Sequence, residues 1–270
     1  MKNLVANSPK LSAWLASMQQ ISFYLWDRGW AERNAGNLSV DVSDCLERSD
    51  LEAGSAIALD QRYPSLAGRS FLVTGTGRRY RDLAQDAAAN ACMLRIDDQG
   101  SSYGLLWGGD ADVGFRPTSE FPSHLRIHEH LREAGRPEQV VLHTHPTELI
   151  ALTHLPEYAD ERALNAALLC THPEVKVNVP RGVGLVPYAV PGTEALAQAT
   201  VEVFKRDLCV ALWQWHGVVA VNERIEVAFD LIDALNKSAK VLLLVHATGH
   251  KPRGLSSEQL NELAVEFNLD

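Results

Sequence analysis

The tripeptide Asp98-Gln99-Gly100 places the strongest constraint on the fold, because it is a turn signal between two short strand-like runs. The flanking runs, 93–97 and 103–107, are expected to pair as an antiparallel hairpin. A hairpin does not fit a sheet built entirely from parallel strand–helix units. The sequence therefore predicts a mixed α/β fold with a central, largely antiparallel sheet.

Apolar periodicity predicts further elements on both sides of this hairpin. A helix is expected from Ser8-Pro9 to Gly29, and another capped by Thr118 or Ser119 that runs to Gly135. The remaining helices are expected from about Thr147 and near 193–206, 226–247 and 256–267. Strands are expected at 70–74, 139–143, 174–179 and 209–215.

Size and charge exclude several classes of protein. The 270 residues, 46% of them apolar, can form one large domain, and the absence of repeats and linkers predicts a single domain over residues 1–270. A net charge of −9 argues against a nucleic-acid partner. No uncharged apolar run reaches about 18 residues and no signal core is seen, so we expect a cytoplasmic protein with no membrane partner.

The main chemical signal is His143-Thr144-His145. Residues two apart in a strand point to the same face, so both imidazoles can reach one metal ion. His216, which follows an apolar run and precedes a glycine, is a candidate third ligand. The alternative is two polar residues on a sheet edge. His124 and His128 also have a metal-pair spacing, but they lack the Glu of an H-E-x-x-H motif, and we interpret them as a helix surface.

Two acids and two loops have both structural and catalytic interpretations. Glu120 is either an acid in the first turn of a helix or a general acid/base beside a metal. Glu174 falls on the polar stripe of the predicted strand 174–179. The loops 34–37 and 74–77 contain glycine next to strands, so they are either ordinary turns or phosphate cradles.

In combination these motifs resemble the class II aldolase/adducin-like superfamily, and its rhamnulose-1-phosphate aldolase branch in particular. His143-Thr144-His145-Pro146 and Trp215-His216-Gly217 carry much of the likeness. The matching segments occur in the family's order along most of the chain. They are 29–38, 73–77, 117–124, 142–153, 180–187, 190–193, 215–218, 231–233 and 237–239.

The resemblance implies a single αβα layered domain and a zinc-dependent aldolase. Its zinc ligands would be His143, His145 and His216, with Glu120 as catalytic acid/base. Glu174 aligns with an acid that reaches the active site of a neighbouring subunit in a homotetramer. The positions that match those holding the substrate phosphate are Asn34, Gly36, Asn37, Thr76, Gly77, Thr118 and Ser119.

The implied reaction is the reversible cleavage of L-rhamnulose 1-phosphate to dihydroxyacetone phosphate and L-lactaldehyde. Fuculose-phosphate aldolase, ribulose-phosphate 4-epimerase and methylthioribulose-phosphate dehydratase share the fold and stay open as alternatives. An amidohydrolase would need regular strand–helix alternation, which the predicted hairpin contradicts. A non-enzymatic adducin-like module would not need the three candidate histidines and Glu120.

Overall fold

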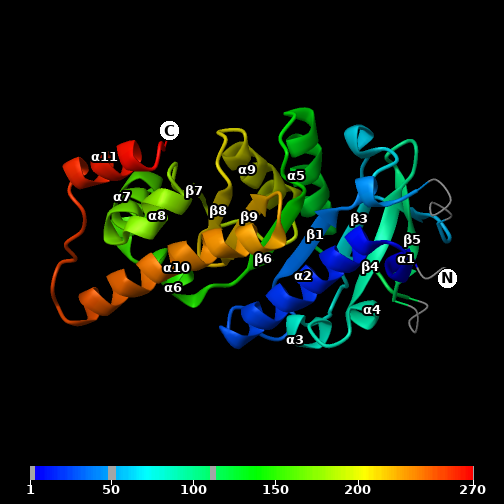
Figure 1. The fold of residues 1–270 in the computed structure, drawn as a ribbon, viewed down its shortest axis with the longest axis horizontal. Helices are drawn as coiled ribbons and strands as arrows, with labels where there is room; N and C mark the ends of the chain where they lie inside the picture. The colour runs from blue at the N-terminus through cyan, green and yellow to red at the C-terminus, as the bar shows by residue number, and fades with distance from the viewer. Residues whose placement is uncertain (1–3, 48–52, 110–113, 270) are drawn as a thin grey trace.

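The computed structural model describes residues 4–47, 53–109 and 114–269, and it is built around one nine-stranded sheet (Figure 1). The strand order is β2-β5-β4-β3-β1-β6-β9-β8-β7. All neighbouring strands run antiparallel except β7 and β8. The largely antiparallel sheet predicted from the sequence is therefore confirmed.

The predicted hairpin is formed by β4 (Ala91–Ile96) and β5 (Ser102–Gly108), which pair with a register shift between Met93 and Leu94. The other strands are β1 (Asn37–Asp41), β2 (Ile57–Ala58), β3 (Ser70–Thr74), β6 (Val140–Thr144), β7 (Gly184–Val186), β8 (Val210–Trp213) and β9 (Gly217–Asn222).

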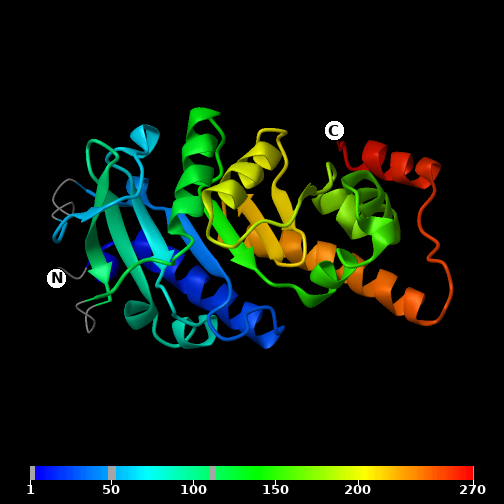
Figure 2. The same cartoon turned by 180° about the vertical axis from the view of Figure 1, so that it is seen from behind.

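Helices cover both faces of the sheet, as Figures 1 and 2 show from opposite sides. The longer helices are α2 (Pro9–Asp27), α5 (Phe121–Glu133), α7 (Glu161–Thr171), α9 (Glu194–Phe204), α10 (Ile225–Ala247) and α11 (Ser257–Glu266). The shorter ones are α1 (Leu4–Asn7), α3 (Tyr80–Leu83), α4 (Ala87–Asn90), α6 (Thr147–Leu152) and α8 (Pro173–Asn178), with 3-10 turns at Ser43–Cys45, Pro64–Leu66 and Pro156–Tyr158.

Alternation along the strands assigns the helices to their layers. In β6, Val140 and Leu142 join the core beneath α2 and α10, whereas Val141 joins the core beneath α5 and α9. Residues two apart on a strand share a face, so one strand contributes to two cores. The result is the predicted αβα layering, with β1 and β6 at the centre of the sheet.

The predicted strand at 174–179 is wrong, because this segment forms the helix α8. Pro173 occupies the first turn, where its missing N–H costs nothing, and Glu174 follows it there. Val175 and Val179, four residues apart, are buried, which is a helical spacing that also satisfies a period of two. Asn178 Nδ2 donates to the Glu174 carbonyl at 2.8 Å, a contact between successive helical turns.

The predicted cap of α5 is also wrong. Glu120, rather than Thr118 or Ser119, occupies the N-cap position, and its side chain makes no capping hydrogen bond. Thr118 Oγ1 instead accepts from the Glu120 N–H at 3.3 Å. The Glu120 carboxylate therefore does not cap the helix and can make other contacts. Across the described residues, no helix is both long and apolar enough to cross a membrane.

Candidate active site

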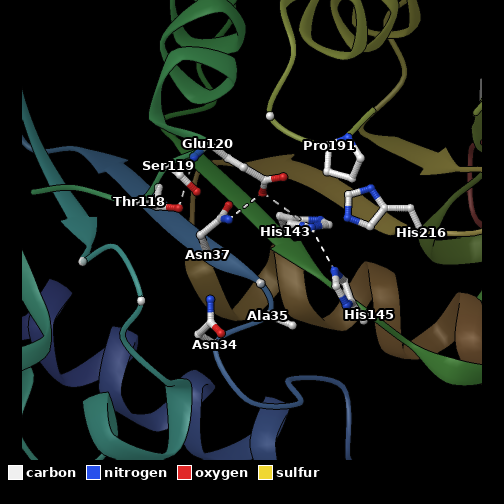
Figure 3. Close-up of a pocket in the computed structure, with 14 residues that line it drawn as sticks. Asn34, Ala35, Asn37, Thr118, Ser119, Glu120, His143, His145, Pro191 and His216 are labelled. Carbon is white, nitrogen blue, oxygen red and sulfur yellow. Dashed lines mark hydrogen bonds and ion pairs between the residues drawn. The ribbon is translucent and has the colours of Figure 1, made fainter. Parts of the chain in front are cut away.

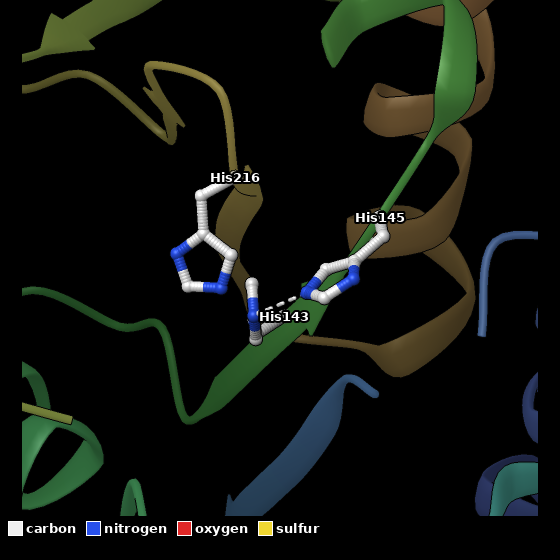
Figure 4. A group of neighbouring side chains, drawn as sticks. All are labelled: His143, His145 and His216. Carbon is white, nitrogen blue, oxygen red and sulfur yellow. Dashed lines mark hydrogen bonds between the residues drawn. The ribbon is translucent and has the colours of Figure 1, made fainter. Parts of the chain in front are cut away.

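Strand pairing brings three histidines together at the end of β6 (Figure 4). His143 lies on β6 and His145 follows its last residue. His216 lies on the short turn between β8 and β9. Because β9 pairs with β6 up to Thr144 and Val218, this turn lies beside the end of β6. The predicted grouping of His143, His145 and His216 is thus reproduced in space.

The turn that carries His216 is held in an unusual backbone conformation. Trp215 has a φ of 62°, which is rare for a residue with a side chain. Its backbone N–H donates to Thr153 Oγ1 and its indole Nε1–H donates to the Thr153 carbonyl, both at 3.0 Å. These two hydrogen bonds stabilise the conformation and fix the direction in which His216 leaves the turn.

The histidine nitrogens are arranged as a metal-ligand set. One nitrogen from each ring lies within 4.8 Å of the others. His143 Nδ1 is 3.0 Å from the Val218 carbonyl, and His145 Nδ1 is 2.9 Å from Glu32 Oε1. Both oxygens are acceptors, so both Nδ1 atoms carry the proton and both Nε2 atoms present lone pairs.

These two Nε2 atoms are 3.2 Å apart, and two lone pairs at that distance repel each other. A cation between them would convert the repulsion into coordination. His216 Nδ1 adds a buried polar atom with no hydrogen-bond partner among the described residues. The residues present therefore fit a metal ion.

The surroundings of His143 and His216 keep these two imidazoles neutral. Burial, reinforced by the neighbouring His145 and His216 rings, holds the pKa of His143 well below its usual value. Burial and His145 lower the pKa of His216 to about 4. Neutral imidazole is the form that binds metal, so at pH 7 both rings are ready to coordinate without losing a proton first.

Gly217 allows the imidazoles to approach this closely. A Cβ at this position would lie 2.6 Å from the Thr144 carbonyl, 2.8 Å from His145 Cδ2 and 3.0 Å from His143 Cε1. The first two distances are shorter than real Cβ contacts. The close packing of the imidazoles therefore requires a glycine directly after His216.

The Glu120 carboxylate lies beside the histidines (Figure 3). Its Oε2 is 3.7 Å from His143 Nε2 and accepts a hydrogen bond from Asn37 Nδ2 at 2.6 Å. Glu120 comes from the start of α5 and Asn37 from the start of β1, which pairs with β6 through Asn37 and His143. An acid and a metal-ligand set thus share one site.

These groups line a cavity of about 190 Å³. Gly36 joins the loop 34–37 to the histidines: its φ is +78°, and an added Cβ would lie 2.8 Å from the His143 carbonyl. The cavity also lies at the N-terminus of α5, where the helix dipole favours an anion. Its lining includes the predicted phosphate positions Asn34, Gly36, Asn37, Gly77, Thr118 and Ser119.

Two predicted residues do not line this cavity in the described part of the chain. Thr76 is exposed, although its neighbours Gly75 and Gly77 both face the cavity. Glu174 is exposed on α8 and lines a second cavity with Arg28 and Lys237.

Sequence reasoning missed a polar group behind the cavity. His124 and His128, interpreted as a helix surface, are buried with only 3% and 4% of their area exposed. Both contact the buried hydroxyl of Ser39 on β1. The i, i+4 spacing was visible in the sequence, but it does not reveal which strand the histidines face.

Comparisons with known proteins agree with this site. The family model described as Class II Aldolase and Adducin N-terminal domain matches residues 16–243. A rhamnulose-1-phosphate aldolase of Bacteroides thetaiotaomicron is 38% identical over 272 residues, covering 100% of this chain and 99% of the relative. One from Klebsiella pneumoniae is 36% identical over 269 residues, covering 96% of this chain and 95% of the relative.

A solved structure has the same fold. The crystal structure of a sugar-phosphate aldolase from Thermotoga maritima superposes with a TM-score of 0.79 at 32% identity, covering 90% of this chain and 99% of that one. These matches confirm the resemblance predicted from the motifs. The chain therefore belongs to the class II aldolase and adducin N-terminal domain family, and it is an aldolase of that family.

Proposed function

We propose that this aldolase catalyses the zinc-dependent, reversible cleavage of L-rhamnulose 1-phosphate to dihydroxyacetone phosphate and L-lactaldehyde. The observation that carries the proposal is the convergence of three histidines and Glu120 on one cavity that the glycine loops also line. The similarity to rhamnulose-1-phosphate aldolases over nearly the whole chain supports the choice of sugar.

His143, His145 and His216 would hold the zinc ion. Bound there, zinc would supply Lewis-acid chemistry, because three neutral ligands leave its positive charge available to stabilise the negative charge that develops on the substrate oxygens. Glu32 and the Val218 carbonyl hold the imidazoles in the tautomer that presents Nε2. The protein therefore provides the orientation of the ligands as well as the ligands themselves.

Glu120 would be the acid/base that transfers a proton to and from carbon C3 of the substrate. Cleavage breaks the bond between C3 and C4, the C4 hydroxyl gives its proton to solvent as the aldehyde forms, and the electron pair of the broken bond stays on the three-carbon fragment. Glu120, having taken a proton from solvent, would protonate that fragment at C3, and in the aldol direction its carboxylate would remove the same proton. Its position next to His143 supports a role within reach of the reacting carbons.

The phosphate would bind at Asn34, Gly36, Asn37, Thr76, Gly77, Thr118 and Ser119. These positions offer backbone N–H groups, two amides and three hydroxyls, and the dipole of α5 adds positive potential. Binding remote from the cleaved bond would orient C3 and C4.

We further propose that the single domain of residues 1–270 assembles as a homotetramer, with Glu174 acting in the site of a neighbouring subunit. Its exposure, and its place outside the histidine cavity of its own chain, support this assignment. Mixing inactive Glu174→Gln and inactive His143→Ala proteins under subunit exchange should restore activity, since some hybrid sites are intact. Mixtures that form hybrid tetramers but stay inactive would argue against a shared site.

The proposal is tested with purified protein of measured zinc content. Release of dihydroxyacetone phosphate from L-rhamnulose 1-phosphate is followed with a coupled reductase, with and without a chelator, and L-fuculose 1-phosphate is the comparison substrate. Rapid chelator-sensitive release with a preference for rhamnulose is expected. Zinc-loaded protein that prefers fuculose, or that releases no product from either sugar, would remove the rhamnulose assignment.

A further inference from the structure

Two polar stripes face each other behind the cavity. Asn37 and Ser39 are two apart on β1, so they share a face of the strand. Glu120, His124 and His128 are spaced by four along the start of α5, so they share a face of the helix. Asn37, Ser39, His124 and His128 are between 0% and 5% exposed, in a region that is otherwise apolar core.

Hydrogen bonds connect the two stripes without a gap. Ser39 Oγ is 2.8 Å from His128 Nε2 and 2.7 Å from His124 Nδ1. His124 Nε2 is 2.5 Å from Asn37 Oδ1, and Asn37 Nδ2 is 2.6 Å from Glu120 Oε2. The chain of contacts therefore runs from the buried His128 to the carboxylate that lines the cavity.

The acceptor at one end determines the direction of every hydrogen bond in this chain. An ionised Glu120 can only accept, so Asn37 must turn its NH₂ group towards it and its Oδ1 towards His124. His124 then donates from Nε2, which leaves its Nδ1 to accept from the Ser39 hydroxyl. Ser39 Oγ in turn accepts from His128 Nε2–H.

Burial keeps this arrangement intact. It lowers the pKa values of His124 and His128 to about 3, so both rings are neutral at pH 7, with one donor and one acceptor nitrogen each. Reversing the order would place Asn37 Oδ1 against the carboxylate. By donating to His124 Nδ1, Ser39 therefore stabilises the His124 tautomer whose Nε2–H holds the Asn37 amide in this rotamer.

We propose that Ser39, His124 and His128 are positioning residues that orient Asn37 and, through it, the Glu120 carboxylate for proton transfer. Among the described residues, Asn37 and His143 both contact Glu120 through Oε2, which leaves Oε1 to exchange the proton with the substrate. This inference rests on the proposed role of Glu120 as the acid/base.

The first test compares Ser39→Ala with Ser22→Ala. Both serines are fully buried, but Ser22 Oγ has no hydrogen-bond partner among the described residues, so its loss is a matched control. Ser39→Ala should lower kcat about tenfold, equivalent to about 1.4 kcal/mol of barrier. KM should stay within about twofold and zinc content should not change. Wild-type kcat in Ser39→Ala would overturn the proposal.

The second test asks whether Ser39 acts through Glu120. In a Glu120→Gln background, Ser39→Ala should change kcat by less than about twofold, because the group being oriented is already gone. A tenfold loss in both backgrounds would overturn the proposal, since a merely structural effect is additive. Ser39→Cys keeps the shape of the side chain, slightly enlarged, with a weaker donor, and it gives the same comparison if Ser39→Ala does not fold.

A third test is independent of the substrate. In protein labelled with ¹⁵N in its histidine rings, NMR should show His124 as the neutral Nε2–H tautomer, and Ser39→Ala should keep this tautomer but move the Nδ1 resonance to that of an imidazole nitrogen that accepts no hydrogen bond. An Nδ1–H tautomer in the wild type would overturn the proposal. Near-normal turnover in Glu120→Gln would instead remove the proposed role of Glu120, so the two failures are distinguishable.

Discussion

Gly217→Ala is expected to weaken metal binding without removing a ligand. The new Cβ would lie 2.6 Å from the Thr144 carbonyl and 2.8 Å from His145 Cδ2, so the backbone or the imidazole must move by several tenths of an ångström. Small displacements of this kind at the support of a metal ligand typically cost about 10- to 100-fold in metal affinity, which is about 1.4 to 2.8 kcal/mol.

The affinity is measured by competition with a chromophoric zinc chelator, and kcat is then measured at saturating zinc. Gly54→Ala is the matched control, because a Cβ there would lie 3.5 Å from the Leu105 carbonyl, which is an ordinary contact. Gly217→Ala should lose affinity and Gly54→Ala should not. Equal zinc affinity in the two variants would refute the argument that close packing against Gly217 positions the imidazoles.

Three further predictions concern single groups of the site. His143→Ala should lose zinc and activity together; normal turnover with stoichiometric zinc, measured by elemental analysis, would contradict the ligand assignment. Glu120→Gln should keep zinc and lose more than about tenfold in kcat, or about 1.4 kcal/mol of barrier, and a smaller loss would argue against acid/base catalysis. Metal-free protein should lose stability as the pH falls from about 6.5 towards 3, because the unfolded chain binds protons that buried His124 and His128, with pKa values near 3, do not. Urea unfolding should show a slope of up to about 1.4 kcal/mol per pH unit for each of these histidines, and a flat profile would contradict their burial in the neutral form.

Local chemistry in the sequence was enough to predict much of the fold. The turn at 98–100 predicted the β4–β5 hairpin, and the H-x-H pair predicted two converging imidazoles at the end of a strand. Both depend on residues close together in the chain. The grouping of His216 with that pair depends on the pairing of β6 with β9, and the resemblance to a family, rather than periodicity, pointed to it.

The errors arose where a local pattern has two solutions. In 174–179, valines at every second position satisfy a strand, but Val175 and Val179 also satisfy a helix, and packing in the folded chain favoured the helix. His124 and His128 look like surface residues because polar side chains usually are. Their burial depends on Ser39 of β1, which the spacing along α5 cannot reveal.

The pairing of β6 with β9 also has a consequence for the folding kinetics. The metal-ligand set exists only after segments far apart in the sequence have joined, so zinc has little to bind in an early, locally structured state. Interactions that form late slow unfolding more than they accelerate folding. Zinc bound by the three histidines should therefore mainly slow unfolding. The refolding rates with and without zinc should be nearly equal.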